Sequence, residues 1–276
     1  MQISKIYEVY FSPCGSVEKV VSGMARYAAE KLDIPVETYN FTLPLRKTDV
    51  SFEKGSLVFF GTPVYAGRVP NKIMPYIRDS FHGNGAIAVP VVVFGNRNFD
   101  DALSELRNLL EDNRLHTVAG AAVVARHSFS KVIAAGRPND QDFEDMRKFV
   151  DQVLEKTDQI SNVETLRPVT VPGADQPDKY YVPLGIDGRP AAFLKARPKT
   201  DLSKCDHCGV CGENCPMGSI DRQNPEVVTG ICIKCQACIR KCPTGAKYFD
   251  DEAFLSHKQM LEKNYTGRSE SGFFVI

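Results

Sequence analysis

The chain has 276 residues, 43% hydrophobic and 25% charged, which is typical of a globular protein with one large domain or two modest ones. Its 34 basic residues balance its 34 acidic ones, so the composition points to neither nucleic acid nor an anionic membrane as a partner. No apolar run approaches the length that spans a bilayer, and residues 1–15 lack the features of a signal peptide. We therefore expect a cytoplasmic protein without a membrane or nucleic-acid partner.

Residues 1–162 alternate apolar, strand-like runs with helical patterns. Strands are predicted over residues 3–11, 35–39, 56–61, 86–94 and 117–125, and helices over residues 16–31, 71–80, 100–111 and 140–160. This alternation predicts a parallel sheet that is covered by helices on both faces. Ligands of such sheets bind beyond the carboxyl ends of the strands. The loops that follow the strands are therefore the candidate binding sites.

Three of these loops carry suitable residues. The first is Ser12-Pro13-Cys14-Gly15-Ser16-Val17, which places hydroxyl groups and backbone amides at the start of a helix and so predicts an anion site. The loop after the third strand contains Thr62, Pro63 and Tyr65, and the loop after the fourth contains Gly95, Asn96, Asn98 and Phe99. Both combine glycine, polar groups and an aromatic ring.

With these three loops, the N-terminal half resembles the flavodoxin-like FMN domains. The resemblance implies an α/β fold with a doubly wound, five-stranded parallel sheet in the order 2-1-3-4-5. It also implies that Ser12, Gly15 and Ser16 hold the FMN phosphate within the loop that contains Pro13, Cys14 and Val17. The flavin ring would then be lined by Thr62, Pro63, Tyr65, Asn96 and Phe99, together with Gly95 and Asn98.

Cys14 and Val17 depart from the family pattern, because hydroxyl residues are usual at both positions. The backbone amides and the helix dipole remain available to a phosphate. A cysteine at the start of a helix predicts an unusually acidic thiol, whereas a small residue that only fills a tight loop is the alternative. A doubly wound domain without a cofactor is the alternative for the whole half.

His127 follows the fifth predicted strand, near the same edge of the sheet. It is the candidate catalytic residue, as a proton donor to reduced flavin or to a substrate. A hydrogen-bonded loop histidine is the alternative. Residues 163–196 are rich in proline and glycine, which predicts an extended linker with short strands around residues 180–184 and 191–194.

Eight of the nine cysteines lie between Cys205 and Cys242. They form two runs of C-x2-C-x2-C-x3-C-P, in which every cysteine recurs at the same offset, and this indicates an internal duplication. The first run is Cys205, Cys208, Cys211 and Cys215, and the second is Cys232, Cys235, Cys238 and Cys242. Structural zinc is the alternative, but zinc sites usually combine two C-x2-C pairs with a longer spacer.

Three closely spaced thiolates reach three irons of one cubane from a single loop, and the fourth cysteine ligates the other cluster. This assigns Cys205, Cys208, Cys211 and Cys242 to one [4Fe–4S] cluster, and Cys232, Cys235, Cys238 and Cys215 to the other. Residues 197–250 closely resemble the bacterial two-cluster ferredoxins, which implies a small α+β domain. After it, residues 250–263 predict an amphipathic helix. The hydrophobic tail that follows is expected to pack back on the chain or to make a homodimer contact.

The whole chain resembles the flavodoxin–ferredoxin fusion proteins. The resemblance divides it into an FMN domain (1–162), a linker (163–196), a two-cluster domain (197–250) and a C-terminal helix with its tail (251–276). It implies an electron carrier between redox partner proteins. A flavin-dependent reductase of a small organic substrate and a ferredoxin with a flavin-free docking domain remain as alternatives. No G-x-G-x-x-G opens a helix after a strand, so the sequence does not support direct oxidation of NAD(P)H.

Overall fold

The computed structural model describes residues 1–44, 49–177 and 179–276. Its main sheet contains five long parallel strands, β1 (Lys5–Tyr10), β2 (Val36–Asn40), β4 (Ser56–Pro63), β6 (Ile87–Phe94) and β8 (Ala119–Val124). Their order across the sheet is β2-β1-β4-β6-β8. An antiparallel strand, β11 (Gly272–Val275), extends the sheet beside β8, and the two-residue strand β7 (His116–Thr117) pairs with β6. This mixed α/β fold with a mainly parallel sheet fits the flavodoxin-like expectation, although the described sheet has seven strands rather than five.

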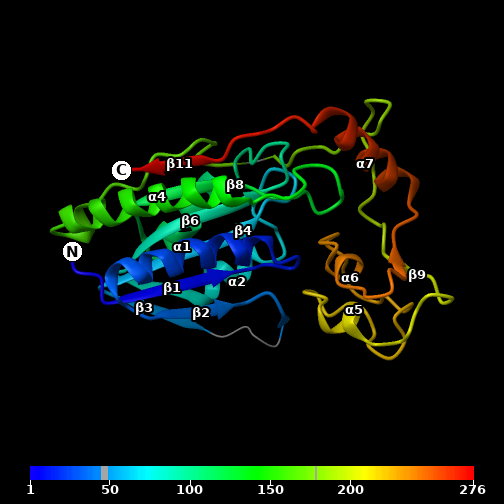
Figure 1. The fold of residues 1–276 in the computed structure, drawn as a ribbon, viewed down its shortest axis with the longest axis horizontal. Helices are drawn as coiled ribbons and strands as arrows, with labels where there is room; N and C mark the ends of the chain where they lie inside the picture. The colour runs from blue at the N-terminus through cyan, green and yellow to red at the C-terminus, as the bar shows by residue number, and fades with distance from the viewer. Residues whose placement is uncertain (45–48, 178) are drawn as a thin grey trace.

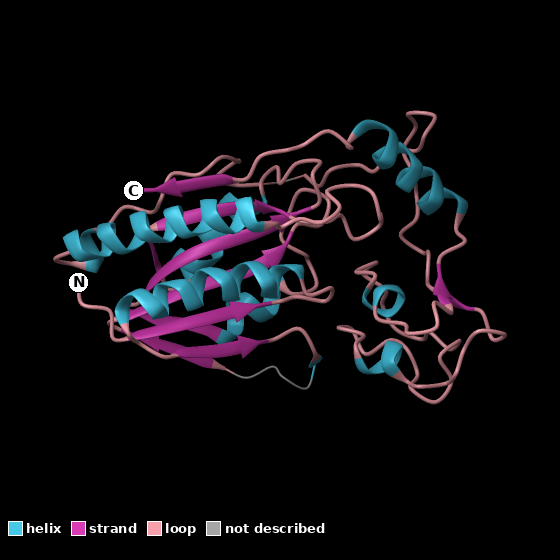
Figure 2. Cartoon of the chain, in the orientation of Figure 1, coloured by secondary structure: helices cyan, strands magenta, loops and turns pink. Residues whose placement is uncertain are grey.

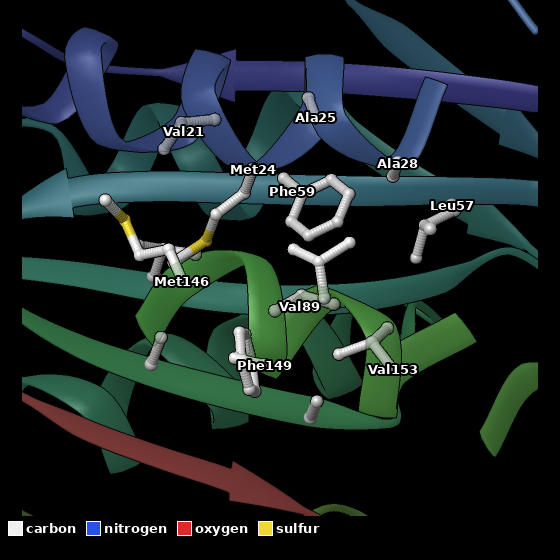
Figure 3. Close-up of a cluster of buried hydrophobic side chains, with 14 of the residues drawn as sticks. Val21, Met24, Ala25, Ala28, Leu57, Phe59, Val89, Met146, Phe149 and Val153 are labelled. Atoms are coloured by element: carbon white, nitrogen blue, oxygen red, sulfur yellow. The ribbon is translucent and has the colours of Figure 1, made fainter. Parts of the chain in front are cut away.

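Helices cover both faces of the sheet, as the apolar runs predict. α1 (Ser16–Leu32) and α4 (Asp140–Gln159) lie side by side on one face, whereas α2 (Met74–Ser80) and α3 (Ala102–Asp112) cover the other (Figure 1). Figure 3 shows the core beneath α1 and α4, where Met24 and Met146 meet Phe59 and Val89 of the sheet. Every residue of β6 is buried, which explains why this strand reads as a continuous apolar run.

Two details differ from the sequence prediction in this half. α2 begins at Met74 rather than at residue 71, with a proline in its first turn. A second, two-stranded parallel sheet joins β3 (Val50–Glu53) to β5 (Phe81–Asn84), and the sequence analysis did not predict either strand. Both strands have only four residues, so their alternating pattern is too short to identify them.

The duplication in the cysteine-rich sequence is also present in the backbone conformation of this region. The one-turn helices α5 (Val210–Glu213) and α6 (Ala237–Arg240) occupy equivalent positions in the two runs and follow Gly209 and Gln236, which both adopt left-handed backbone angles. His207 and Lys234, which are also equivalent, have nearly equal positive φ angles of 55° and 56°. The short strands β9 (Lys199–Thr200) and β10 (Lys247–Tyr248) pair to close the region.

The linker begins with a one-turn 3-10 helix, Val163–Thr165, and then runs as loops over the surface (Figure 2). Val163, Val169 and Val171 are buried, so its first residues pack on the N-terminal half. The short strands expected at 180–184 and 191–194 do not form, and the described residues of this segment contain only an isolated bridge between Leu184 and Pro190. Within the described chain, no helix has the length and apolar composition that crossing a membrane requires.

The C-terminal segment returns from the cysteine-rich region to the main sheet. α7 (Glu252–Asn264) agrees closely with the helix predicted over residues 250–263. The apolar tail then becomes β11, so it packs back on the chain as one of the two expectations stated (Figure 1). The cysteine-rich region consequently lies beyond the carboxyl ends of the parallel strands, connected to the N-terminal half both by the linker and by this returning segment (Figure 1).

We predict that Phe273→Ala destabilises the protein by about 2 kcal/mol, because the Phe273 ring in β11 packs against Phe149 of α4 with centroids 5.1 Å apart. Chemical denaturation of the anaerobic protein measures this change. Leu194→Ala is the matched control, since Leu194 is 90% exposed and its truncation should leave the stability unchanged. Equal stabilities of Phe273→Ala and the wild type would mean that the returning strand adds little to the core.

Candidate functional site

A cavity of about 70 Å³ lies at the start of α1, beyond the carboxyl ends of β1, β4, β6 and β8. Five residues of the predicted phosphate loop line it: Ser12, Pro13, Cys14, Ser16 and Val17. Pro63, Tyr65, Gly95 and His127 contribute from the loops after the later strands. Cys235 and Arg240 close the cavity from the cysteine-rich region, so both halves of the chain form it.

The conformation of the first loop leaves the start of α1 open to a ligand. Gly15 caps the helix with φ 83°, a left-handed angle that favours glycine, and open space surrounds its Cα. The Glu18 amide donates to the Ser12 hydroxyl at 3.0 Å. Among the described groups, no acceptor pairs with the amides of Ser16 and Val17. These two amides and the helix dipole therefore favour an anion in the cavity.

Cys14 connects the phosphate loop to the cysteine-rich region, because its thiol donates to the Cys235 carbonyl at 2.9 Å. Burial raises the pKa of Cys14, and the nearby Arg240 and Lys241 only partly offset this effect. The expectation of an unusually acidic thiol is therefore wrong. The helix start does favour a thiolate, but the overlying loop removes the thiol from water.

A second cavity of about 580 Å³ adjoins the first, and both are lined by Tyr65, Gly95 and His127. It lies between the sheet edge, the linker and the cysteine-rich region. Its remaining wall combines Asn98 with aromatic groups from the linker and α7, namely Tyr180, Tyr181, Phe193 and His257, and with residues 231–234 of the cysteine-rich region. A cavity of this size accommodates a drug-sized ligand.

Thr62, Asn96 and Phe99 of the predicted flavin loops line neither cavity. Thr62 is fully buried in β4, and Phe99 packs against Phe94 with ring centroids 5.4 Å apart. Asn96 has a left-handed φ of 70°, which asparagine tolerates, and its amide donates to the carbonyls of Tyr265 and Gly267 at 2.7 and 2.6 Å. Asn96 therefore anchors the returning C-terminal segment.

His127 is neutral over most of the physiological pH range. Burial, with smaller contributions from His257 and Arg97, lowers its pKa to about 4. The Phe129 amide donates to Nδ1 at 3.1 Å, so Nε2 carries the proton of the neutral ring. The ring lies directly on Gly95, where an added Cβ atom would come within 2.4 Å of Cδ2. A neutral imidazole donates a hydrogen bond well but a proton poorly, which disfavours the predicted role as proton donor.

His257 gives the larger cavity a complementary group. Its Nδ1 lies 2.8 Å from the Leu184 carbonyl, which only accepts, so Nδ1 is the protonated nitrogen. Nε2 of the neutral ring is then an acceptor. His127 and His257 thus supply one donor and one acceptor to the same cavity. The sequence analysis missed His257 because α7 reaches this site only through the fold.

The eight clustered cysteines surround two small cavities in the cysteine-rich region. Cys205, Cys208, Cys211 and Cys242 line one cavity, and Cys215, Cys232, Cys235 and Cys238 line the other. Each cavity thus combines three cysteines of one run with the fourth of the other run. Within the described residues, no three or more His, Cys, Asp and Glu side chains form a group that could hold a metal ion. The ligand role of the cysteines therefore remains a prediction.

Comparisons with known proteins give only distant likenesses. No protein-family model and no curated protein matches the chain. Solved structures similar to it include the rubredoxin oxygen:oxidoreductase of Desulfovibrio gigas, with 16% identity, a TM-score of 0.38 and coverage of 57% of this chain and 37% of that one. An archaeal flavodoxin has 13% identity and a TM-score of 0.39, over 56% of this chain and 99% of that one. The apo form of the NADH:FMN oxidoreductase EmoB has 13% identity and a TM-score of 0.42, over 55% of this chain and 89% of that one.

We predict that Asn96→Ala loosens the C-terminal segment and leaves flavin binding unchanged. The substitution removes two hydrogen bonds to backbone carbonyls and one from the Ser269 amide, which should cost about 3 kcal/mol in total. Hydrogen–deuterium exchange should rise over residues 265–269. Asn98→Ala is the control, because Asn98 lines the larger cavity and its side chain bonds only to the neighbouring amides of Phe99 and Asp100 among the described groups. If Asn96→Ala lost flavin while hydrogen–deuterium exchange over residues 265–269 stayed unchanged, Asn96 would line the flavin as first predicted.

We also predict that His127 stays neutral at pH 6. A lowered folded pKa means that the unfolded chain binds more protons, so this residue stabilises the fold fully above about pH 6.5 and loses that contribution as the pH falls towards 4. The ¹⁵N shifts of its ring nitrogens, followed from pH 8 to 5 in histidine-labelled protein, should report a protonated Nε2 and an unprotonated Nδ1 throughout. An imidazolium signal for His127 at pH 6 would contradict this assignment.

Proposed function

We propose that this protein transfers electrons between two [4Fe–4S] clusters and FMN, and on to a redox partner protein. The observation that carries the proposal is the junction of the two halves. Cys235 lines the same cavity as the predicted phosphate loop, and Cys232 lines the larger cavity beside it. Predicted ligands of one cluster thus lie at the predicted flavin site, as electron exchange requires.

The residues at the carboxyl edge fit a flavin mononucleotide. The open start of α1, with Ser12, Gly15 and Ser16, suits its phosphate, and the adjoining 580 Å³ cavity suits its ring. Pro63, Tyr65, Gly95 and Asn98 are the predicted flavin residues that line these cavities. Bound FMN supplies a centre that exchanges one or two electrons, whereas a cluster exchanges one.

The cysteine-rich region fits two cubanes in its donor set and its grouping. Four thiols face each cavity, in the crossed combination that the two-cluster ferredoxin pattern predicts. A hydrogen bond to sulfur is present at the cavity that Cys215, Cys232, Cys235 and Cys238 line, where the Ser219 amide donates to Cys215 Sγ at 3.3 Å. Hydrogen bonds of this kind tune the reduction potential of a cluster that is held by thiolates.

Tyr65 lines both cavities at the junction. Desolvation raises its pKa well above the usual value, and the neighbouring thiols of Cys235, Cys14 and Cys232 raise it further. The ring therefore stays protonated and uncharged. It lines both cavities beside the cysteine loop without placing a charge there.

A flavin-dependent reductase is the second candidate function. The larger cavity favours it, because its aromatic wall and the neutral rings of His127 and His257 offer a donor and an acceptor to a small organic substrate beside the flavin. A substrate that oxidises the reduced protein at a saturable rate, and that His257→Phe slows without slowing transfer to a carrier protein, would establish this activity.

Metal, sulfide and flavin contents test the main proposal. Protein that is purified and analysed anaerobically should contain about eight irons, eight acid-labile sulfides and one FMN per chain. Cys215→Ala and Cys242→Ala should each perturb one cluster and leave the other intact, because each serves a different cavity. Electron paramagnetic resonance of the reduced variants distinguishes the two signals.

Two outcomes would revise the proposal. Stoichiometric zinc without sulfide would contradict the cluster assignment. Full clusters without flavin, even after addition of FMN, would leave a ferredoxin with a docking domain. If electron transfer to the flavin were lost in Cys215→Ala and retained in Cys242→Ala, this would support electron transfer through the cluster nearer the junction.

A further inference from the structure

Arg240 belongs to the cysteine-rich region but lines the cavity at the start of α1. It is the last residue of α6 and comes directly before Lys241 and Cys242 at the end of the second cysteine run. Among the described residues, no other cation lines this cavity from that region. Its guanidinium therefore approaches the predicted phosphate loop from the opposite side to Ser12 and Ser16.

The Nη1 atom of Arg240 is buried and has no hydrogen-bond partner in the described part of the chain. A buried donor without a partner is costly, and more so when it is charged. The buried guanidinium groups of Arg68 and Arg137, by contrast, pair with the carboxylates of Glu105 and Asp142.

The neighbour that Arg240 does have is a poor acceptor. It lies near the Cys14 thiol, whose pKa burial raises and Arg240 partly lowers. A thiol accepts hydrogen bonds only weakly, so the site lacks an anion that the guanidinium can bind.

We propose that Arg240 donates to the phosphate of the bound flavin, so that both halves of the chain hold one phosphate monoester. The amides of Ser16 and Val17 and the hydroxyl groups of the first loop would contact it from one side, and the Arg240 guanidinium from the other. A planar guanidinium suits phosphate because it offers parallel N–H donors. This inference rests on the proposed function only for the identity of the ligand as FMN.

A clamp of this kind makes flavin binding and domain contact interdependent. Cys14 Sγ and the Cys235 carbonyl already join the two halves beside the cavity. A phosphate that bonds to both halves stabilises this contact increasingly as its occupancy rises. Riboflavin fills the same ring site but lacks the phosphate, so it gains nothing from Arg240.

The test compares FMN with riboflavin on the full chain, with its clusters loaded and its flavin removed. Arg240→Gln should weaken FMN binding about 10- to 100-fold, as expected for a charge-assisted hydrogen bond, and leave riboflavin binding unchanged. Arg240→Lys should weaken FMN binding less than Arg240→Gln does, because lysine keeps the positive charge but lacks the planar pair of N–H donors. Arg222→Gln is the matched control, since this exposed arginine of the same region pairs with Glu213 away from the cavity.

Phenylglyoxal modification of the wild type gives a readout that needs no variant. Mass spectrometry of the modified protein should show that FMN and inorganic phosphate protect Arg240 and that riboflavin does not. Protection by phosphate without any flavin binding would sustain the clamp and remove FMN from the proposed function. The inference would be overturned if Arg240→Gln weakened the binding of FMN and of riboflavin equally. It would also be overturned if phenylglyoxal modified Arg240 at the same rate whether or not FMN or inorganic phosphate was present.

Discussion

The junction at the carboxyl edge depends on the way the chain leaves the sheet and comes back to it. The linker carries the cysteine-rich region past the strand ends, and the last strand, β11, returns to pair with β8. Asn96 fixes this return with hydrogen bonds to the carbonyls of Tyr265 and Gly267, which come 169 and 171 positions later in the sequence. Two attachments restrict the cysteine-rich region far more than one would. The contact between Cys14 and Cys235, and the cavities on either side of it, follow from that restriction.

Burial at this junction suppresses charge on most of its titratable groups. Desolvation raises the pKa of Cys14 and Tyr65 and lowers that of His127, so all three are neutral near pH 7. Arg126 and Arg240 both line the smaller cavity beside these neutral groups, so the junction favours an anionic ligand.

The sequence predicted the parts of the fold that local patterns encode. Buried strands such as β6 are apolar over their whole length, and the constant offset between the cysteine runs identified the duplication that the backbone repeats. Cys215 and Cys242 each line the cavity opposite to that of the other cysteines in their run. The missed features depend on contacts between distant segments. Asn96 stands in the right loop for a flavin residue, but a segment 173 positions away uses its side chain. No local pattern reports such a partner, and the same holds for β11, Arg240 and His257.

The duplicated runs have diverged where one of them faces the junction. Glu213 and Arg240 occupy equivalent positions at the ends of α5 and α6, and His207 and Lys234 are equivalent as well. Glu213 pairs with Arg222 on the exposed side, whereas Arg240 enters the cavity at α1. Lys234 lines the larger cavity and donates to the Cys232 carbonyl at 3.0 Å. The second run therefore places two cations, Lys234 and Arg240, at the cavities of the junction. An exact duplication would place the same charges on both runs, so this divergence gives the cysteine set at the junction its own electrostatic surroundings.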